Sequence, residues 1–396
     1  MNNNAQPRST LVIRPIQYRD LNPVASLLTT HLAEEYDPRK YNLLKKIEQY
    51  HSCYGLLQLA RIIPWLEDKD FHVYVAEKDG QIQGLIQVAP VNYSRSTWKV
   101  EQVVINSKTP LNHILIGSCS VGSQLLRYCF EKIWEARTWI IEVDINEKNR
   151  IGLYRENGFQ PLAQITYWEC DSQLLKRLAQ QEPNLPNLLP VSNADAKLIY
   201  QLDCVSLPPV LRQVFDRHIE DFKKSFWQYL TEKIRGWLDQ TDNVSAYVFE
   251  PQRKAAIGHF QLQICKNGRQ PHQAQLLVHP AYTWLYPKLL TQMAILVEKF
   301  PSQSLLLSSA DYQTEREEFL EKMRAQRKQH NLLMSRSVWH KLRETRAHDF
   351  SLSEVLGSLK PVQNPIPTPW GKSHWENANP SDSHKTPPRE DNNNTV

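Results

Sequence analysis

The order of predicted elements in residues 98–169 constrains the fold of this chain more than any other feature. The sequence there predicts a strand, a loop of small residues, an amphipathic helix, a strand, a short helix and a further strand. The amphipathic helix is expected over 118–137, where apolar residues recur at helical spacing. Its N-terminus therefore directly follows the loop of small residues. Such a terminus offers unpaired backbone N–H groups and the positive end of the helix dipole, which together suit a diphosphate group.

The same order of elements recurs in the second half of the chain. Gly84 in IQGLIQV corresponds to Gly258 in AIGHFQL, and the strands WIIEV and SLLLSS follow in matching order. A chain of 396 residues is longer than one core usually organises, so two copies of one architecture are predicted. The predicted division is a disordered 1–9, a first domain 10–170, a connector 171–186, a second domain 187–345 and a polar, proline-rich, mostly disordered tail 346–396.

Composition and charge exclude several classes of protein. The net charge is +5, and the basic residues are dispersed, so no basic stripe indicates nucleic-acid binding. The 6 cysteines include no CxxC pair, and the 13 histidines are scattered, so neither a metal site nor a disulfide framework is expected. No apolar run approaches the roughly 20 residues of a membrane span, and the N-terminus lacks the apolar core of a secretory signal. We therefore expect a cytoplasmic protein that binds neither nucleic acid nor membrane.

The first half contains two short motifs, the run Gly-Leu-Tyr-Arg-Glu-Asn-Gly-Phe at 152–159 and the loop Gly-Ser-Cys-Ser-Val-Gly at 117–122. Both resemble motifs of the GCN5-related N-acetyltransferase (GNAT) family, which binds acetyl-CoA. The resemblance covers about residues 10–340. It implies an α+β (mixed α/β) fold with two tandem GNAT-like domains, each a twisted mixed sheet flanked by helices.

The family's coenzyme loop reads [QR]xxGx[GA]. Here Gly122 stands at the last position, Ser120 replaces the middle glycine, and Gly117 stands where Gln or Arg belongs. Backbone N–H groups bind the diphosphate in this motif, so small residues retain part of that function. The alternative is a degenerate fold that keeps the loop shape without a ligand. The residues to which the resemblance assigns acetyl-CoA binding are Val104, Gly117, Ser118, Ser120, Val121, Gly122, Ser123 and Asn149.

The resemblance also implies two catalytic residues. Tyr154 would protonate the departing CoA thiolate, and packing against the sheet is its alternative role. Glu101, on the strand WKVEQVVI, would take the proton of the incoming amine, with Glu142 as a weaker candidate. The first copy is thus expected to move an acetyl group from acetyl-CoA to an amine.

The second copy is expected to be non-catalytic. Trp284, Tyr286 and Pro287 occupy its equivalent loop and helix start, where bulk and the missing proline N–H exclude a diphosphate. Two functions remain open: an acetyl-CoA-dependent N-acyltransferase with a small-molecule or protein amine as acceptor, and a catalytically inactive GNAT-fold binding or regulatory protein. Trp370 and Trp375 in the tail are either a docking motif for a partner or an unexplained feature of its composition.

Overall fold

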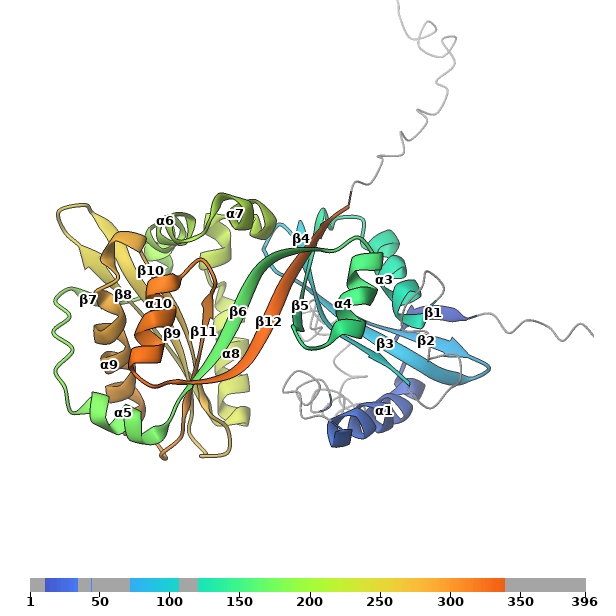
Figure 1. Ribbon diagram of the computed structural model, residues 1–396, viewed down its shortest axis with the longest axis horizontal. Coiled ribbons are helices and arrows are strands. Elements are labelled where there is room, and N and C mark those ends of the chain that lie inside the picture. Colours follow the sequence, from blue (N-terminus) through green and yellow to red (C-terminus); the bar gives the residue numbers. More distant parts are fainter. Residues whose placement is uncertain (1–10, 35–43, 45–71, 107–119, 339–396) are drawn as a thin grey trace, which may run out of the picture. The chain divides into compact units, whose positions relative to one another are not determined.

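The first half of the chain carries its strands and helices in the predicted order. The computed structural model describes residues 11–34, 44, 72–106 and 120–338, and all of them belong to one unit, Met1–His340 (Figure 1). The predicted disordered N-terminus, the loop 107–116 and the tail lie outside the described residues. The elements of the first half are β1 (Val12–Pro15), η1 (Tyr18–Asp20), α1 (Leu21–Glu34), β2 (His72–Lys78), β3 (Gln81–Pro90), β4 (Thr97–Ile105), α3 (Val121–Lys132), β5 (Thr138–Asp144), α4 (Lys148–Glu156) and β6 (Gln160–Cys170).

A second set of elements repeats that order after helix α5 (Ser172–Ala179), which lies within the predicted connector. The sequence predicts a single helix over 219–238, but the structure divides this segment into η4 and α8. The elements of the second half are β7 (Leu188–Pro190), η3 (Asn193–Asp195), α6 (Ala196–Ser206), α7 (Pro209–Phe215), η4 (Ile219–Phe222), α8 (Phe226–Asp239), β8 (Thr241–Glu250), β9 (Ala255–Cys265), β10 (His272–Val278), η5 (Pro280–Tyr282), α9 (Leu285–Glu298), β11 (Leu305–Ala310), α10 (Thr314–Lys322) and β12 (Gln326–Ser337).

All twelve strands of the described part form one mixed sheet, in the order β1-β2-β3-β4-β5-β12-β6-β11-β10-β9-β8-β7. The two halves exchange their last strands. Strand β12 of the second half pairs antiparallel with β5, and β6 of the first half pairs antiparallel with β11. The two exchanged strands also pair with each other (Figure 1). The predicted boundary at residue 170 is therefore no break in the sheet.

Two equivalent glycines confirm the internal repeat. Gly84 pairs with Ile105 across β3 and β4, and Gly258 pairs with Val278 across β9 and β10. A Cβ atom on Gly84 would lie 3.2 Å from Val121, the first residue of α3, and one on Gly258 would lie 3.0 Å from Leu285, the first residue of α9. In both halves a glycine thus lets the crossover helix approach the sheet closely.

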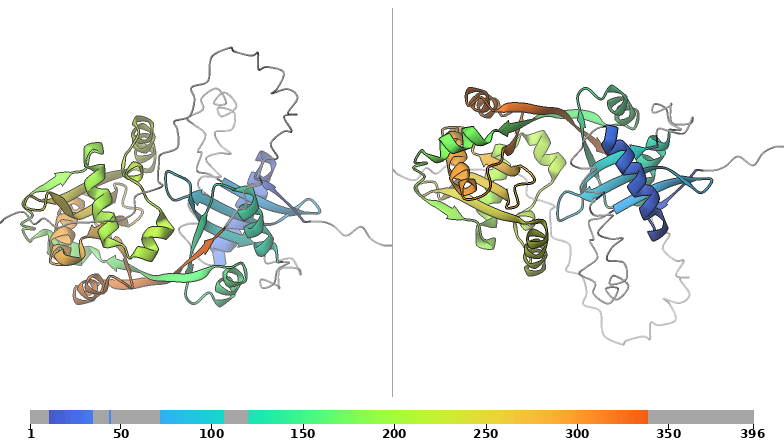
Figure 2. Two further views of the ribbon diagram at one scale, coloured as in Figure 1. Left: turned by 90° about the horizontal axis from the view of Figure 1, so that it is seen from above. Right: turned by 90° about the horizontal axis from the view of Figure 1, so that it is seen from below.

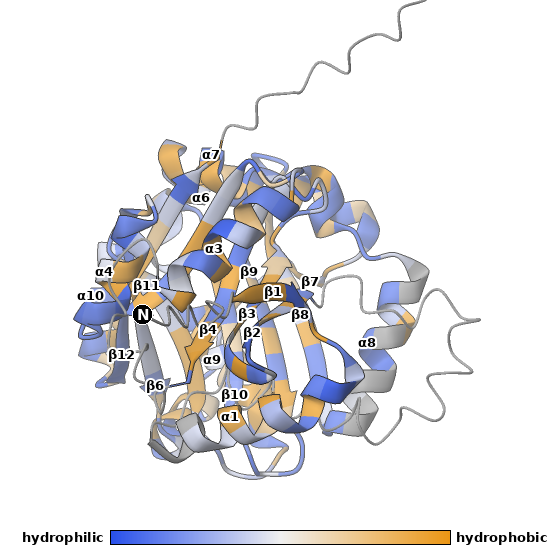
Figure 3. Cartoon of the chain, turned by 90° about the vertical axis from the view of Figure 1, so that its right-hand side faces the viewer, coloured by the Kyte–Doolittle hydropathy of each residue, from blue (hydrophilic) through white to orange (hydrophobic). Residues whose placement is uncertain are grey.

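The cores lie between this sheet and its helices. In the first half, α3 and α4 cover one face over a cluster that includes the fully buried Trp98 and Trp139. Helix α1 packs against the other face of β2 and β3 (Figure 2). Helices α3 and α6 show both hydrophobic and hydrophilic colours, as amphipathic helices do (Figure 3). Among the described helices, none is long and apolar enough to cross a bilayer.

Candidate functional site

The first half contains a point where two parallel strands part. Strands β4 and β5 pair from Thr97 and Thr138 as far as Val100 and Ile141. Beyond that point, within the part of the chain that the structure describes, β4 pairs only with β3, and β5 pairs only with β12. The carboxyl ends of adjacent parallel strands are the usual place for a ligand in an open mixed sheet. We call this place the β4–β5 parting.

A β-bulge marks the parting. Gln87 of β3 pairs with Gln102 of β4, whereas the next residue, Val88, pairs with Val100. Glu101 is therefore the extra residue, without a partner in the ladder. A bulge bends its strand and redirects the backbone groups beside it. The side chain of Glu101 is partly exposed, with its Oε2 atom 3.2 Å from Lys99 Nζ.

The N-terminus of α3 follows β4 in the chain, as predicted. The amides of Val121 and Gly122 belong to the first turn, so neither has an acceptor within the helix. The next amide is satisfied, because Ser123 N–H donates to Ser120 Oγ at 3.1 Å. Asn157 Nδ2 in turn donates to Ser123 Oγ at 2.8 Å and ties α3 to the end of α4. The side chains of Ser120 and Ser123 thus cap and brace the helix. Gly117 and Ser118 lie outside the described residues.

Close packing accounts for the glycine at position 122. A Cβ atom there would lie 2.8 Å from Leu153 Cδ2 and 3.1 Å from Ile105 Cδ1. The Cα of Gly122 therefore faces the contact with α4 and β4. Only its N–H belongs to the predicted diphosphate-binding turn.

The other predicted residues are placed in three different environments. Val104 is buried in the cluster beneath α1, so its contribution to a site is limited to its backbone. Asn149 is exposed on the first turn of α4. Tyr154 is only 3% exposed, and its ring packs edge-on to Phe159 at 6.0 Å. Glycine at position 158 predicts a C-terminal cap for α4, and the structure confirms it: the φ of Gly158 is +82°, and Phe159 N–H donates to Tyr154 O at 3.0 Å.

One side chain from the second half reaches the first-half site. Asn331 on β12 donates from Nδ2 to Glu142 Oε1 on β5 at 2.6 Å. The two residues are 189 positions apart in sequence. Sequence reasoning named Glu142 only as a weak candidate and missed Asn331, because no local pattern shows which strand will lie beside β5.

The equivalent place in the second half is filled by the chain itself. Tyr286, the second residue of α9, is buried where α3 has Gly122, whereas Trp284 is half exposed with its ring 4.8 Å from Lys288 Nζ. Arg316, on the first turn of α10, donates from Nη1 to Leu276 O of β10 at 3.0 Å. Among the described residues its buried Nε and Nη2 atoms have no acceptor, and burial lowers the pKa of this guanidinium to about 10. Strands β9 and β10 pair without a register shift, so this half has no bulge like that at Glu101.

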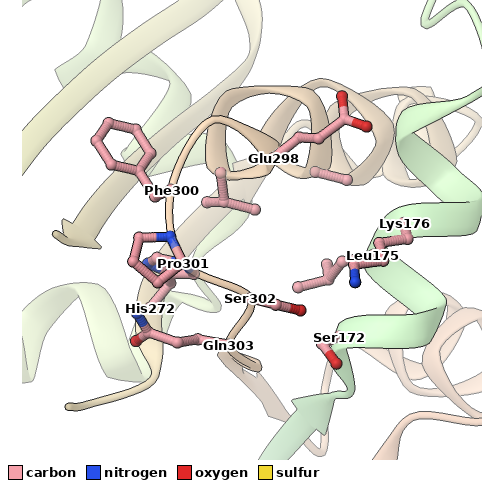
Figure 4. Close-up of a pocket in the computed structure, with 11 residues that line it drawn as sticks. Ser172, Leu175, Lys176, His272, Glu298, Phe300, Pro301, Ser302 and Gln303 are labelled. Carbon is pink, nitrogen blue, oxygen red and sulfur yellow. The ribbon is translucent and has the colours of Figure 1, made fainter. Parts of the chain in front are cut away.

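A small cavity of about 50 Å³ lies elsewhere in the second half (Figure 4). Ser172 and Lys176 of α5 line it, together with His272 and the turn around Pro301. Pockets for organic ligands usually measure about 300–1,000 Å³. This cavity is much smaller, and none of the predicted site residues lines it.

Comparison with solved structures identifies the fold. A GCN5-related N-acetyltransferase from Sphaerobacter thermophilus aligns with 83% of this chain and 95% of its own, at a TM-score of 0.50 and 13% identity. A tandem GNAT protein from the clavulanic acid biosynthesis pathway aligns with 84% of this chain and 100% of its own, at a TM-score of 0.51 and 13% identity. No protein-family model and no curated protein matches the sequence. The chain therefore has the tandem GNAT fold, and the predicted fold class is confirmed.

Proposed function

We propose that this protein is an acetyl-CoA-dependent N-acyltransferase whose first half, residues 10–170, carries the reaction. The observation that carries the proposal is the bulge at Glu101 beside the β4–β5 parting. A carboxylate, the start of α3 and the stretch of β4 and β5 where these two strands no longer pair with each other then lie toward the same end of the sheet. The second half has neither the bulge nor a small residue at the start of its helix.

The residues present fit the coenzyme. The first-turn amides of Val121 and Gly122 and the positive end of the α3 dipole suit its diphosphate. Ser120 keeps the loop side chain small. When bound, acetyl-CoA supplies a thioester whose acetyl carbon is open to attack by an amine. Its role here is that of a co-substrate, with one molecule per chain in the first half.

Two side chains would then move protons. Glu101 would accept the proton that the acceptor amine loses as its nitrogen bonds to the acetyl carbon. Tyr154 would donate a proton to the sulfur as the carbon–sulfur bond breaks, because a protonated thiol is a better leaving group than a thiolate. Transfer would be direct, without a covalent enzyme intermediate.

Calorimetry with acetyl-CoA, followed by an assay of amine-dependent CoA release, tests this function. We expect one binding site per chain and turnover with a primary amine. In Glu101→Gln, turnover should fall at least about 10²-fold with acetyl-CoA affinity unchanged. The exposed Glu131 on α3 offers a matched control, and Glu131→Gln should behave as wild type. Wild-type protein that binds no acetyl-CoA would refute the proposal.

A second candidate is a GNAT-fold protein that binds a ligand and catalyses nothing. The cap at Ser120 favours it, since the hydroxyl already occupies one amide of the helix N-terminus. This candidate predicts acetyl-CoA binding without CoA release for any amine tested.

A further inference from the structure

We infer that Arg336, on strand β12 of the second half, is a positioning residue for the coenzyme. Arg336 holds the end of α4, and buried hydrogen bonds connect that helix end to the first turn of α3. This role of Arg336 deepens the proposed function and rests on it, because it takes the first turn of α3 as the binding place of the diphosphate. The second half would then bind no coenzyme itself and still set the coenzyme affinity of the first half.

The guanidinium of Arg336 lies at the C-terminal end of α4. Its Nη1 atom donates to the backbone carbonyl of Asn157, which is the C-cap of that helix, and its Cζ atom lies 4.2 Å from the ring centroid of Phe130. A cation at this end of a helix is favoured by the last carbonyls and by the negative end of the dipole. Burial and, second, the charge of Arg127 lower the pKa of the guanidinium, so the protein holds this charge here at a cost.

The side chain of Asn157 connects this helix end to α3. Its Nδ2 atom donates to Ser123 Oγ at 2.8 Å, and Ser123 Oγ also accepts from Ser120 Oγ at 3.0 Å. The three side chains are excluded from water, because Ser123 is 0% exposed, Asn157 4% and Ser120 5%. Hydrogen bonds are stronger in such surroundings than in water. An unbroken set of polar contacts thus leads from Arg336 to the N-cap of α3.

Asn157 has an unused acceptor that packing does not explain. Among the described residues its buried Oδ1 atom has no hydrogen-bond partner. An unsatisfied buried acceptor destabilises the fold, and a leucine of similar size would avoid that cost. The bond from Nδ2 to Ser123 is the reason we give for an amide at this position.

The contacts fix the turn that would hold the diphosphate. The amides of Val121 and Gly122 come directly before Ser123 in the first turn of α3. Binding is tighter when such donors already point to one place, since ordering them at the moment of binding costs affinity. The contact between Gly122 and Leu153 sets the spacing of α3 and α4, and the hydrogen bonds through Asn157 add a fixed orientation.

The internal repeat provides the comparison. The exchanged strands pair Asn331 with Ile165, and counting the same distance along each strand makes Cys170 the counterpart of Arg336. The N-cap, the third residue of the crossover helix and the C-cap of the next helix are Ser120, Ser123 and Asn157 in the first half and Trp284, Pro287 and Met323 in the second. Each of the four polar residues is thus replaced in the half that lacks the proposed reaction.

Calorimetric titrations of the full-length chain test this role. They would compare acetyl-CoA with S-acetylpantetheine, which has the thioester arm and lacks the diphosphate. We expect Arg336→Met and Ser123→Ala each to bind acetyl-CoA about tenfold more weakly, and the double variant to bind it no more weakly than Ser123→Ala. Arg336→Lys, which keeps a charged donor, should bind it nearly as wild type does. Affinity for S-acetylpantetheine should stay unchanged in all of them.

The exposed Arg127 on α3 offers a matched control. Arg127→Met removes a positive charge near Arg336 without removing any of these hydrogen bonds, and it should bind acetyl-CoA as wild type does. Circular dichroism at the titration temperature checks that each variant is folded. Arg336→Gln, which removes the charge and keeps an amide donor, is the second variant if the methionine variant does not fold, and it should also bind acetyl-CoA more weakly.

The outcomes separate this role of Arg336 from the proposed function. Wild-type affinity for acetyl-CoA in folded Arg336→Met, or an equal loss for both ligands, would overturn the role and leave the proposed function standing. Strictly additive losses in the double variant would show that Arg336 does not act through Ser123, and would overturn it too. Wild-type protein that binds no acetyl-CoA would refute the proposed function itself.

Discussion

The Cα of Gly122 lies against the side chain of Leu153, where an added Cβ would come within 2.8 Å of Cδ2. Leu153 is itself 1% exposed, so it has little room to move aside. Gly122, which matches the last position of the coenzyme motif, therefore also sets the spacing between α3 and α4 through its contact with Leu153. A substitution at position 122 therefore alters the packing of α3 against α4 even when no ligand is bound.

Gly122→Ala should accordingly destabilise the protein. We expect a loss of roughly 1–3 kcal/mol in the free energy of unfolding from overpacking, partly offset by the better helix propensity of alanine. The double variant Gly122→Ala with Leu153→Ala should recover part of that loss relative to Leu153→Ala alone. Denaturant unfolding of the four proteins measures the coupling. Purely additive effects would show that the two residues do not constrain each other.

Tyr154→Phe separates chemistry from packing. The ring is buried against Phe159, and phenylalanine preserves that contact. If the hydroxyl protonates the thiolate, turnover should fall by roughly 10²-fold or more while acetyl-CoA affinity stays nearly unchanged. Steady-state kinetics and calorimetry on the same preparation check both. Full turnover in the variant would make Tyr154 a packing residue.

Arg316→Met should not lower the thermal stability of the protein. The guanidinium is buried with two nitrogen atoms lacking acceptors, and the bond to Leu276 O is its main polar contact in the described structure. Burying a charge that lacks a counter-ion costs free energy, and an apolar side chain removes that cost. Arg14→Met is the matched contrast, because Arg14 pairs with the buried Asp20 at 2.6 Å and with Glu77 at 2.5 Å. In thermal unfolding, the melting temperature should fall clearly for Arg14→Met only. An equal fall in both variants would contradict this prediction.

Asp20 should make the protein sensitive to acid. Burial alone would raise the pKa of its carboxyl, but hydrogen bonds from Arg14 and from Gln17 N–H outweigh burial and lower the pKa below 3.8. A lowered pKa in the folded state contributes stability above pH 3.8, and this contribution is lost as the pH falls through the folded-state pKa. Wild type should therefore be more stable than Asp20→Asn at neutral pH, and the gap should shrink below that pH. Unfolding midpoints of both proteins between pH 3 and 7 test this, and a gap independent of pH would refute it.

A fragment ending at Cys170 should fold poorly. In the full chain β5 pairs with β12, and β6 pairs with β11 and β12, so the fragment lacks these second-half neighbours. Unpaired strand edges expose backbone groups and promote aggregation. We expect residues 1–170 to be largely insoluble, or unfolded by circular dichroism, and to recover structure when co-expressed with residues 171–396. A stable, fully active fragment would show that the strand exchange is dispensable.

Most elements could be predicted from sequence because their signals are local. Helical spacing predicts α3, and Gly158 marks the end of α4. The repeat was readable from Gly84 and Gly258, since both positions require a small residue beneath a helix. Local patterns did not distinguish a helix from an irregular connector at α5, which lies in the predicted connector.

The sequence by itself determined the order of elements, the two copies and the residue types near the β4–β5 parting. Only the tertiary structure decided that β6 and β12 change places, that Glu101 is the extra residue of a bulge, and that Asn331 meets Glu142. Alternation along a strand fixes which face is buried, but it does not specify which strand lies alongside. That choice depends on pairing between segments far apart in the chain. The sheet that carries the predicted site therefore takes strands from both halves and is completed only by folding.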